Sequence, residues 1–197
     1  GLSVALLVFA TILVKRILPV VILGGIAALP LLPQSIINRI LTIGNLQDSS
    51  TSYRFRIYEA FFKMLKDYWL VGVGLGSDAV YDVIKTYPQM SNGYYPLHAH
   101  NNYVQLCGEM GILGSVGFLA VVINSIKHGI HSLKGASREM KHFVTAGVSA
   151  LVGILVVSIA EYTWYYPRIM FMFWLIVAMI WAAARIAIAG RQEDLYD

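Results

Sequence analysis

Long apolar segments alternate with short charged ones along most of the chain, and one long polar segment interrupts this alternation. Residues 17–33 are apolar, as are three later segments near residues 102–125, 143–160 and 169–189. Each approaches the length of about 20 residues that a helix needs to cross the hydrocarbon core of a membrane. Residues 1–14 form a shorter apolar segment. The pattern predicts an all-α, polytopic membrane protein with about five spans, the first of them truncated.

Lys15 and Arg16 separate the first two apolar segments. Two adjacent charges at the centre of one long helix would cost about 2.5–3.5 kcal/mol each, so a turn between two spans is favoured. The chain starts inside an apolar segment, with no charged region before it and no small-residue cleavage site after it, which does not fit a signal peptide. We therefore expect the sequence to be the C-terminal part of a longer protein.

The connector after the first of the three later segments is basic. Between residues 127 and 141 it carries four Lys or Arg side chains and one Glu. Excess Lys and Arg are typical of cytoplasmic connectors, which places the long polar segment outside the cytoplasm. The predicted organisation has two transmembrane segments in residues 1–33, an extracytoplasmic loop in 34–100, three transmembrane segments in 101–189 and a cytoplasmic tail in 190–197.

The composition supports a membrane protein. Hydrophobic residues make up 57% of the chain and charged residues 13%, with a mean hydropathy of +0.64, whereas soluble domains carry about 25% charged residues. The net charge of +4 is then explained by the basic connectors, so we expect a lipid bilayer and no nucleic acid as partner. Cys107 is the single cysteine, which excludes an intrachain disulfide.

Residues 53–69 of the polar segment have the period of an amphipathic helix. At about 100° per residue, Arg54 projects near the middle of the apolar arc and Arg56 into solvent. A guanidinium on an apolar surface favours an anionic partner such as a phosphate. The alternative is that Arg54 precedes the helix or extends to lipid headgroups, and the pattern leaves both interpretations open.

The segment after this helix, Val71 to Ser77, has glycine at alternate positions and indicates a structural turn, because it lacks the spacing of a nucleotide-binding loop. His98 and His100 follow further on. A zinc site needs three or four ligands, and no third ligand lies near them in the sequence, so we predict no metal.

If the helix is continued back to His100, the helix face below His100 carries mostly small residues. Such a face would let another helix approach closely. A histidine held at the outer end of such a helix can accept a proton from a hydroxyl near neutral pH. The alternative is a histidine that only caps the helix, as Asn101 can. Glu109 is either functional or a structural hydrogen-bond partner, and Glu161 is expected to pair with Arg168.

These motifs together resemble the O-antigen ligase and O-antigen polymerase family, which consists of bacterial inner-membrane glycosyltransferases that act on undecaprenyl-diphosphate-linked glycans. The resemblance covers residues 50 to 115. It rests on the order and spacing of four motifs, which are Arg54-x-x-x-Tyr58, Asp67-Tyr-Trp-Leu-Val-Gly-Val-Gly-Leu-Gly76, His98-Ala-His100-Asn101-Asn102-Tyr103 and Glu109-x-Gly111-x-x-Gly114.

The resemblance implies a fold like that of membrane-embedded, C-type glycosyltransferases and an active site on the extracytoplasmic face. His100 matches the histidine proposed to activate the acceptor hydroxyl, and Arg54 matches an arginine that neutralises the diphosphate leaving group. Transfer would invert the anomeric carbon and use no metal or other cofactor. We expect four neighbouring residues to contribute to substrate binding, namely Arg56, His98, Asn101 and Tyr58.

The sequence also departs from the family, whose members have more spans and a second essential arginine upstream. The donor would be an undecaprenyl-diphosphate-linked glycan, and the acceptor a glycan, lipid or protein hydroxyl. The identity of the acceptor distinguishes a ligase from a polymerase, and the sequence leaves it open. The segment from Ser77 to Tyr95 is the expected acceptor surface. A transporter or permease of the same superfamily is the alternative function, which would need charged residues on facing spans.

Overall fold

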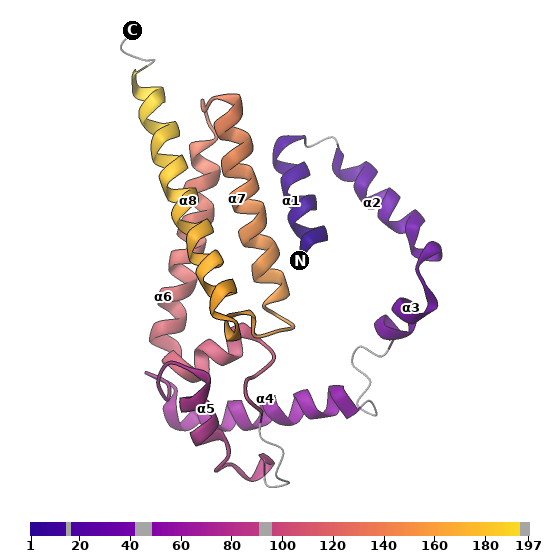
Figure 1. Cartoon of the computed structure of the whole chain (residues 1–197), viewed down its shortest axis with the longest axis vertical. Helices are drawn as coiled ribbons and strands as arrows, with labels where there is room; N and C mark the ends of the chain where they lie inside the picture. The colour runs from indigo at the N-terminus through magenta and orange to yellow at the C-terminus, as the bar shows by residue number, and fades with distance from the viewer. Residues whose placement is uncertain (15–16, 42–48, 91–95, 194–197) are drawn as a thin grey trace. The chain divides into compact units, whose positions relative to one another are not determined.

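The structure is a computed structural model that describes residues 1–14, 17–41, 49–90 and 96–193. These residues are helical or irregular and include no strand, which confirms the predicted all-α class (Figure 1). The helices, including short 3-10 turns, are α1 (Leu2–Leu13), α2 (Ile17–Ala28), η1 (Leu29–Leu31), α3 (Gln34–Leu41), α4 (Ser49–Tyr68), α5 (Ser77–Ile84), η2 (Pro88–Met90), α6 (Asn102–Ser132), α7 (Arg138–Val157), η3 (Thr163–Tyr165) and α8 (Pro167–Glu193).

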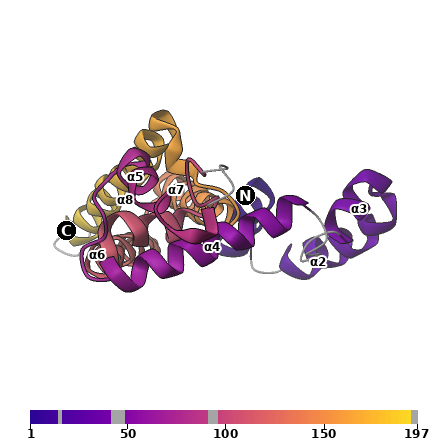
Figure 2. The same cartoon turned by 90° about the horizontal axis from the view of Figure 1, so that it is seen from below.

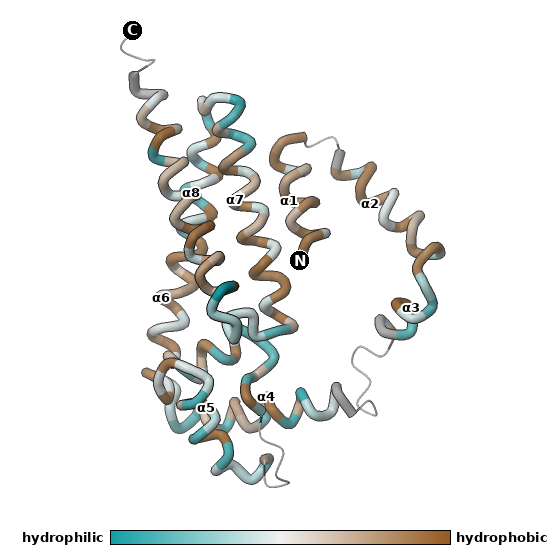
Figure 3. The backbone as a smooth tube through the Cα atoms, viewed as in Figure 1, coloured by the Kyte–Doolittle hydropathy of each residue, from teal (hydrophilic) through white to brown (hydrophobic). Residues whose placement is uncertain are grey.

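Among the described residues, three helices are long and apolar enough to cross a membrane, over residues 102–132, 138–157 and 167–190. They correspond to the three later apolar segments, and their apolar stretches can be followed along α6, α7 and α8 in Figure 3. Residues 2–13 and 18–31 form apolar helices that are shorter. Pro30 falls in the 3-10 turn after α2, where the ring ends regular α-helix. The total of five spans therefore stays a prediction.

The chain divides into two compact units. The bundle unit contains residues 1–18, 116–159 and 163–197. The loop unit contains residues 19–115 together with the short segment 160–162. Because that segment lies between α7 and α8 in the sequence, the loop unit includes residues that are remote along the chain.

Small residues allow close helix packing in the bundle unit. A Cβ atom at Gly129 would lie 2.8 Å from Val148, and one at Gly147 would lie 2.9 Å from Ile180. These glycines let α7 and α8 pack their buried aliphatic side chains against α6 and against each other. Phe118, Trp164 and Phe173 add an aromatic cluster with ring centroids 5.2–5.9 Å apart.

Helix α4 carries the core of the loop unit. Figure 2 shows it as one long helix, with α5 and the start of α6 beside it. Ile57, Ala60, Phe61 and Met64 are completely buried, and they pack with α5, η2 and Ala99 in one apolar cluster. The predicted amphipathic helix is thus confirmed, although it begins at Ser49 rather than at residue 53. One side of the apolar arc is uncovered, since Phe55 and Phe62 are exposed.

Helix α6 is interrupted at Gly111, whose φ of 61° and ψ of −166° are not helical. The interruption releases the carbonyl oxygens of Gly108 and Glu109 from the usual helical pairing. They accept instead from the amides of Val73 and Gly74, at 2.9 and 3.0 Å. The glycine-rich segment is therefore a structural turn, as predicted.

The second part of α6 is joined to the end of α4 in the same way. The Ile112 amide donates to the Trp69 carbonyl at 2.8 Å, and the Leu113 amide donates to Leu70 at 3.3 Å. A Cβ atom at Gly111 would lie 2.4 Å from the Leu70 backbone, a distance that no side chain tolerates. These four backbone hydrogen bonds fix residues 69–74, directly after α4, against α6.

Candidate functional site

His98, Ala99 and His100 form a tight turn directly before α6. Asn101 caps the helix, since its Oδ1 accepts from the amides of Tyr103 at 2.9 Å and Val104 at 3.1 Å. The helix begins at Asn102, so the expectation that it continues back to His100 is wrong. His100 has a φ of +50°, which is uncommon for a residue with a side chain and is found often at functional sites.

The unusual backbone of His100 is stabilised by its neighbours. Its amide donates to Nδ1 of His98 at 3.3 Å, and the Ala99 amide donates to Oε1 of Gln105 at 2.9 Å. Ala99 and Gln105 are both completely buried. The turn is thus anchored to the first turn of α6 and has little freedom to rearrange.

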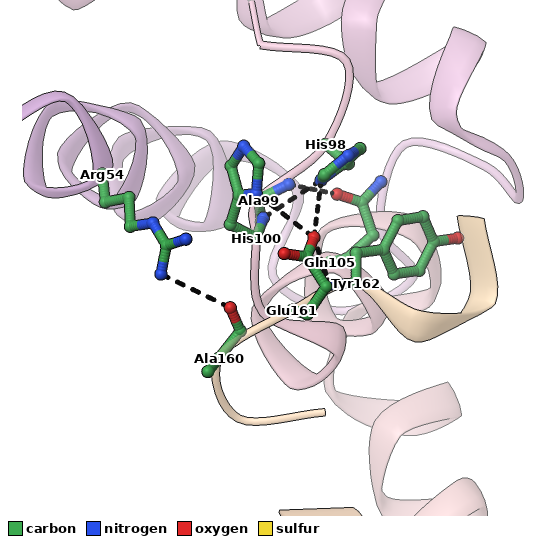
Figure 4. Close-up of polar contacts among 8 residues, drawn as sticks. All are labelled: Arg54, His98, Ala99, His100, Gln105, Ala160, Glu161 and Tyr162. Atoms are coloured by element: carbon green, nitrogen blue, oxygen red, sulfur yellow. Dashed lines mark hydrogen bonds and ion pairs between the residues drawn. The ribbon is translucent and has the colours of Figure 1, made fainter. Parts of the chain in front are cut away.

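Glu161 brings a carboxylate to the two histidines. Its Oε1 lies 3.2 Å from Nδ1 of His100 and 4.0 Å from Nδ1 of His98, as shown in Figure 4. The same oxygen accepts the Tyr162 amide at 3.2 Å. The two imidazole rings are 4.3 Å apart between centroids. The expected pairing of Glu161 with Arg168 is therefore wrong, because Glu161 lies beside His100.

The environment of His98 favours its neutral form. Burial is the main cause that lowers the pKa of His98 below 6.5, and the nearby His100 lowers it further, while Glu161 acts in the opposite direction. A neutral His98 can accept the His100 amide at Nδ1 and keep its proton on Nε2. The lowered pKa of His98 and its hydrogen bond with the His100 amide therefore both favour a neutral His98.

Arg54 reaches the same short segment from α4. Its Nη1 donates to the carbonyl oxygen of Ala160 at 3.4 Å, next to Glu161 (Figure 4). Arg54 is half-buried and Arg56 is exposed, in agreement with the predicted difference in facing. The Arg56 guanidinium lies 5.9 Å from the Tyr53 ring. Tyr58 is half-buried and packs against the core of the loop unit.

A second polar network lies beneath the histidine turn. Oε1 of Glu109 accepts from Gln105 Nε2 at 2.8 Å and from the Tyr162 hydroxyl at 3.1 Å. Burial and then Glu109 raise the pKa of Tyr162 above its ordinary value. Glu109 is therefore a structural hydrogen-bond partner, which is one of the two alternatives that the sequence left open. Tyr162 is 5% exposed, so its hydroxyl belongs to this buried network.

The two networks share one short segment. Residues 160–162 contact Arg54 through Ala160, the histidines through Glu161 and Glu109 through Tyr162. Arg54 and His100 were both predicted from the sequence, whereas the segment that joins them was not. The only signal in the sequence was a carboxylate next to a short turn between two apolar segments.

His98, His100 and Glu161 also form a set of side chains that can bind a metal ion, since one donor atom from each lies within 4.8 Å of the others. No metal was expected because the sequence shows no third ligand near the two histidines. Glu161 is such a ligand in the structure, so the expectation loses its basis. The arrangement is chemically suited either to proton transfer through a histidine–carboxylate pair or to a divalent cation.

Comparison with known families adds a family assignment. Residues 1–119 match the family model described as O-Antigen ligase, which is more than half of the 197 residues. A comparison with curated proteins gives no match. The matched range includes α4, the glycine turn and the histidine turn, while Glu161 lies beyond it. The chain belongs to the O-antigen ligase family.

Proposed function

We propose that this chain forms the catalytic part of a bacterial inner-membrane glycosyltransferase of the ligase or polymerase type. The enzyme transfers a glycan from an undecaprenyl-diphosphate-linked donor to an acceptor hydroxyl on the extracytoplasmic side. The observation that carries the proposal is that Arg54 and His100 contact adjacent residues of one segment, Ala160 and Glu161. A cation for a leaving diphosphate and a base for a hydroxyl are the two groups that this transfer needs.

His100 is the proposed general base. With Nδ1 donating to the Glu161 carboxylate, Nε2 of His100 carries the free electron pair. It takes the proton of the acceptor hydroxyl while the hydroxyl oxygen forms a bond to the anomeric carbon. The bond between that carbon and the diphosphate oxygen breaks at the same time, and attack from the opposite face inverts the configuration. The Glu161 carboxylate stabilises the imidazolium that results.

Arg54 is the proposed partner of the leaving group. Its guanidinium can donate two parallel hydrogen bonds to phosphate oxygens and compensates the charge that develops on the diphosphate. The contact with the Ala160 carbonyl, at 3.4 Å, is long and neutral, so a diphosphate would replace it at low cost. We assign four further residues to substrate binding, namely Arg56, His98, Asn101 and Tyr58. His98 and Asn101 contribute mainly by fixing the histidine turn.

The test compares variants of the full-length protein with a defined undecaprenyl-diphosphate glycan as donor. Positioned acid–base groups contribute about 10²–10⁴-fold to rate, and we expect a loss in this range for His100→Ala. Arg54→Ala should lose a similar factor, and Arg56→Ala, which alters an exposed arginine on the same helix, should lose much less. Equal losses for Arg54→Ala and Arg56→Ala would contradict the assignment of Arg54.

A chelator separates the two chemistries that the histidine cluster allows. Transfer by wild type that is unchanged in chelator supports metal-independent proton transfer. Loss of activity that is restored by a divalent cation would assign the cluster to a metal instead. If the folded wild type consumes no donor with any acceptor, the transporter alternative is favoured.

A further inference from the structure

A groove lies on the bundle unit, at the part of α6 that leads to the basic connector. Six of its lining residues come from α6 and one, Trp181, from α8, and its volume is about 670 Å³. The α6 residues recur at intervals of three and four, so they share one face of the helix. They are Ala120, Val121, Asn124, Lys127, His128 and His131.

The polarity of the groove changes along its length. Ala120 and Val121 line one end, and Lys127 and His131 line the end nearer the connector. At 1.5 Å per residue the two ends are separated by about 15 Å along the helix axis. An apolar end toward the middle of a spanning helix and a basic end near its terminus match the acyl chain and the headgroup of a lipid.

His128 is built into the wall of this groove. Its ring stacks on the indole of Trp181, with centroids 4.4 Å apart and an interplanar angle of 23°. The indole is fixed in turn, because its Nε1 donates to Ser125 Oγ at 2.9 Å. Nε2 of His128 is buried and has no hydrogen-bond partner in the part of the chain that the structure describes. A buried polar atom without a partner is costly, so a ligand that supplies a hydrogen-bond partner for Nε2 would be favoured here.

The basic end of the groove lacks a counter-charge. Lys127 and His131 are exposed, and no ion pair is formed by Lys127 among the described residues. No acidic side chain lines the groove. Basic pockets on spanning helices near the membrane surface are suited to the phosphate of a lipid headgroup.

We propose that this groove binds an anionic phospholipid. Lys127 and His131 contact the phosphate, and the first part of an acyl chain lies along Ala120 and Val121. The apolar end argues for a lipid rather than a soluble phosphate, because a soluble anion would leave that end unfilled. This site is independent of the glycosyl-transfer proposal, since none of its residues belongs to the histidine turn or to α4.

Binding to the purified full-length protein in non-ionic detergent tests the proposal. Native mass spectrometry would compare phosphatidylglycerol with phosphatidylcholine, and glycerol phosphate would be added as a competitor. We expect Lys127→Gln to weaken phosphatidylglycerol binding about fivefold, the effect of one basic residue at a membrane surface. Lys134→Gln is the matched control, because it removes an exposed lysine of the same connector outside the groove, and it should change nothing.

A second readout places the lipid at the groove. Phosphatidylglycerol with brominated acyl chains should quench tryptophan fluorescence in wild type, and Trp181→Phe should lose a corresponding part of the quenching. Three results would overturn the proposal. These are equal affinity for the two lipids, unchanged binding in Lys127→Gln, or full competition by glycerol phosphate, which would assign the groove to a soluble phosphate.

Discussion

At the scale of single residues, the pairing of His100 with Glu161 makes the sharpest prediction. Glu161→Gln keeps an oxygen that accepts from His100 Nδ1 and removes the negative charge. We expect the rate of transfer to fall between about tenfold and a hundredfold, less than for His100→Ala, whose loss is about 10²–10⁴-fold. The measurement is kcat with the lipid-linked donor at saturation, and the donor KM should change little.

A double-mutant cycle distinguishes this role from a general structural effect. If Glu161 acts only through His100, the double variant Glu161→Gln/His100→Ala should be no slower than His100→Ala alone, because residues that act as a unit are not additive. Glu139→Gln is the control, since it alters an exposed carboxylate in the first turn of α7, which belongs to no part of the proposed site. Additive losses in the cycle would show that Glu161 does not act through His100.

The lowered pKa of His98 predicts a pH dependence of stability. Because its folded-state pKa lies below the ordinary value of 6.5, the unfolded chain binds the proton more readily, and stability rises with pH across this interval. The contribution of His98 is therefore complete above pH 6.5 and is lost as pH falls through the folded-state pKa. We expect thermal unfolding of the full-length protein in detergent to occur at lower temperature at pH 5 than at pH 7.5.

His98→Asn isolates this contribution. Its Oδ1 can accept the His100 amide as Nδ1 does, and it does not titrate. The difference in unfolding temperature between pH 5 and pH 7.5 should be smaller in this variant than in wild type. His142→Asn is the control, because His142 is exposed and its Nδ1 contacts the Arg138 carbonyl within α7. An equal reduction in both variants would exclude His98 as the cause.

The residues of the site were predictable to different degrees. Arg54 was found because it breaks the apolar arc of its helix, and His100 because it precedes an apolar helix. The contact of Glu161 with His100 was missed because it joins residues 61 positions apart, and no periodicity encodes such a contact. The charge of Glu161 at a short turn was visible, but the partner was not.

At the scale of elements, hydrophobic period predicted α4 and the three long helices well, and it failed at their ends and interruptions. The break in α6 at Gly111 has no local cause in the sequence, because glycine is tolerated inside helices. It exists because the end of α4 supplies replacement hydrogen-bond partners. The stripe of small residues gave a partial signal, since Gly108 does allow Phe61 and Met64 of α4 to approach closely.

Substituting Gly111 tests whether this junction is essential. Gly111→Ala forces a side chain into a φ of 61° and a ψ of −166°, a region essentially restricted to glycine, at about 1–3 kcal/mol, and also against the Leu70 backbone. We expect a loss of at least about 2 kcal/mol in unfolding free energy, measured by denaturation in detergent. Gly117→Ala is the control on the same helix, where a Cβ atom meets nothing within 4 Å. It should be neutral or stabilising because alanine favours helix.

At the scale of the whole molecule, the membrane character and the family were predicted from composition and motif order, and both are confirmed. Three helices support spans, while the first two apolar segments form helices shorter than a span. The length of α2 could not be inferred from hydropathy, because Pro30 ends the helix inside an apolar segment. The side of the membrane on which each connector lies was argued from charge alone.

Cysteine labelling would test that orientation. In a cysteine-free full-length background, Lys66→Cys lies on α4 and Lys134→Cys lies in the basic connector, and both native lysines are exposed. Excess Lys and Arg favour the cytoplasmic side, so a membrane-impermeant maleimide should label Lys66→Cys in intact cells. It should label Lys134→Cys only after permeabilisation, which also serves as the control for reactivity.

The reverse pattern would place Arg54 and His100 on the cytoplasmic side and contradict an extracytoplasmic site. Because each spanning helix reverses the side, labelling of both positions in intact cells would mean that α6 does not cross the membrane.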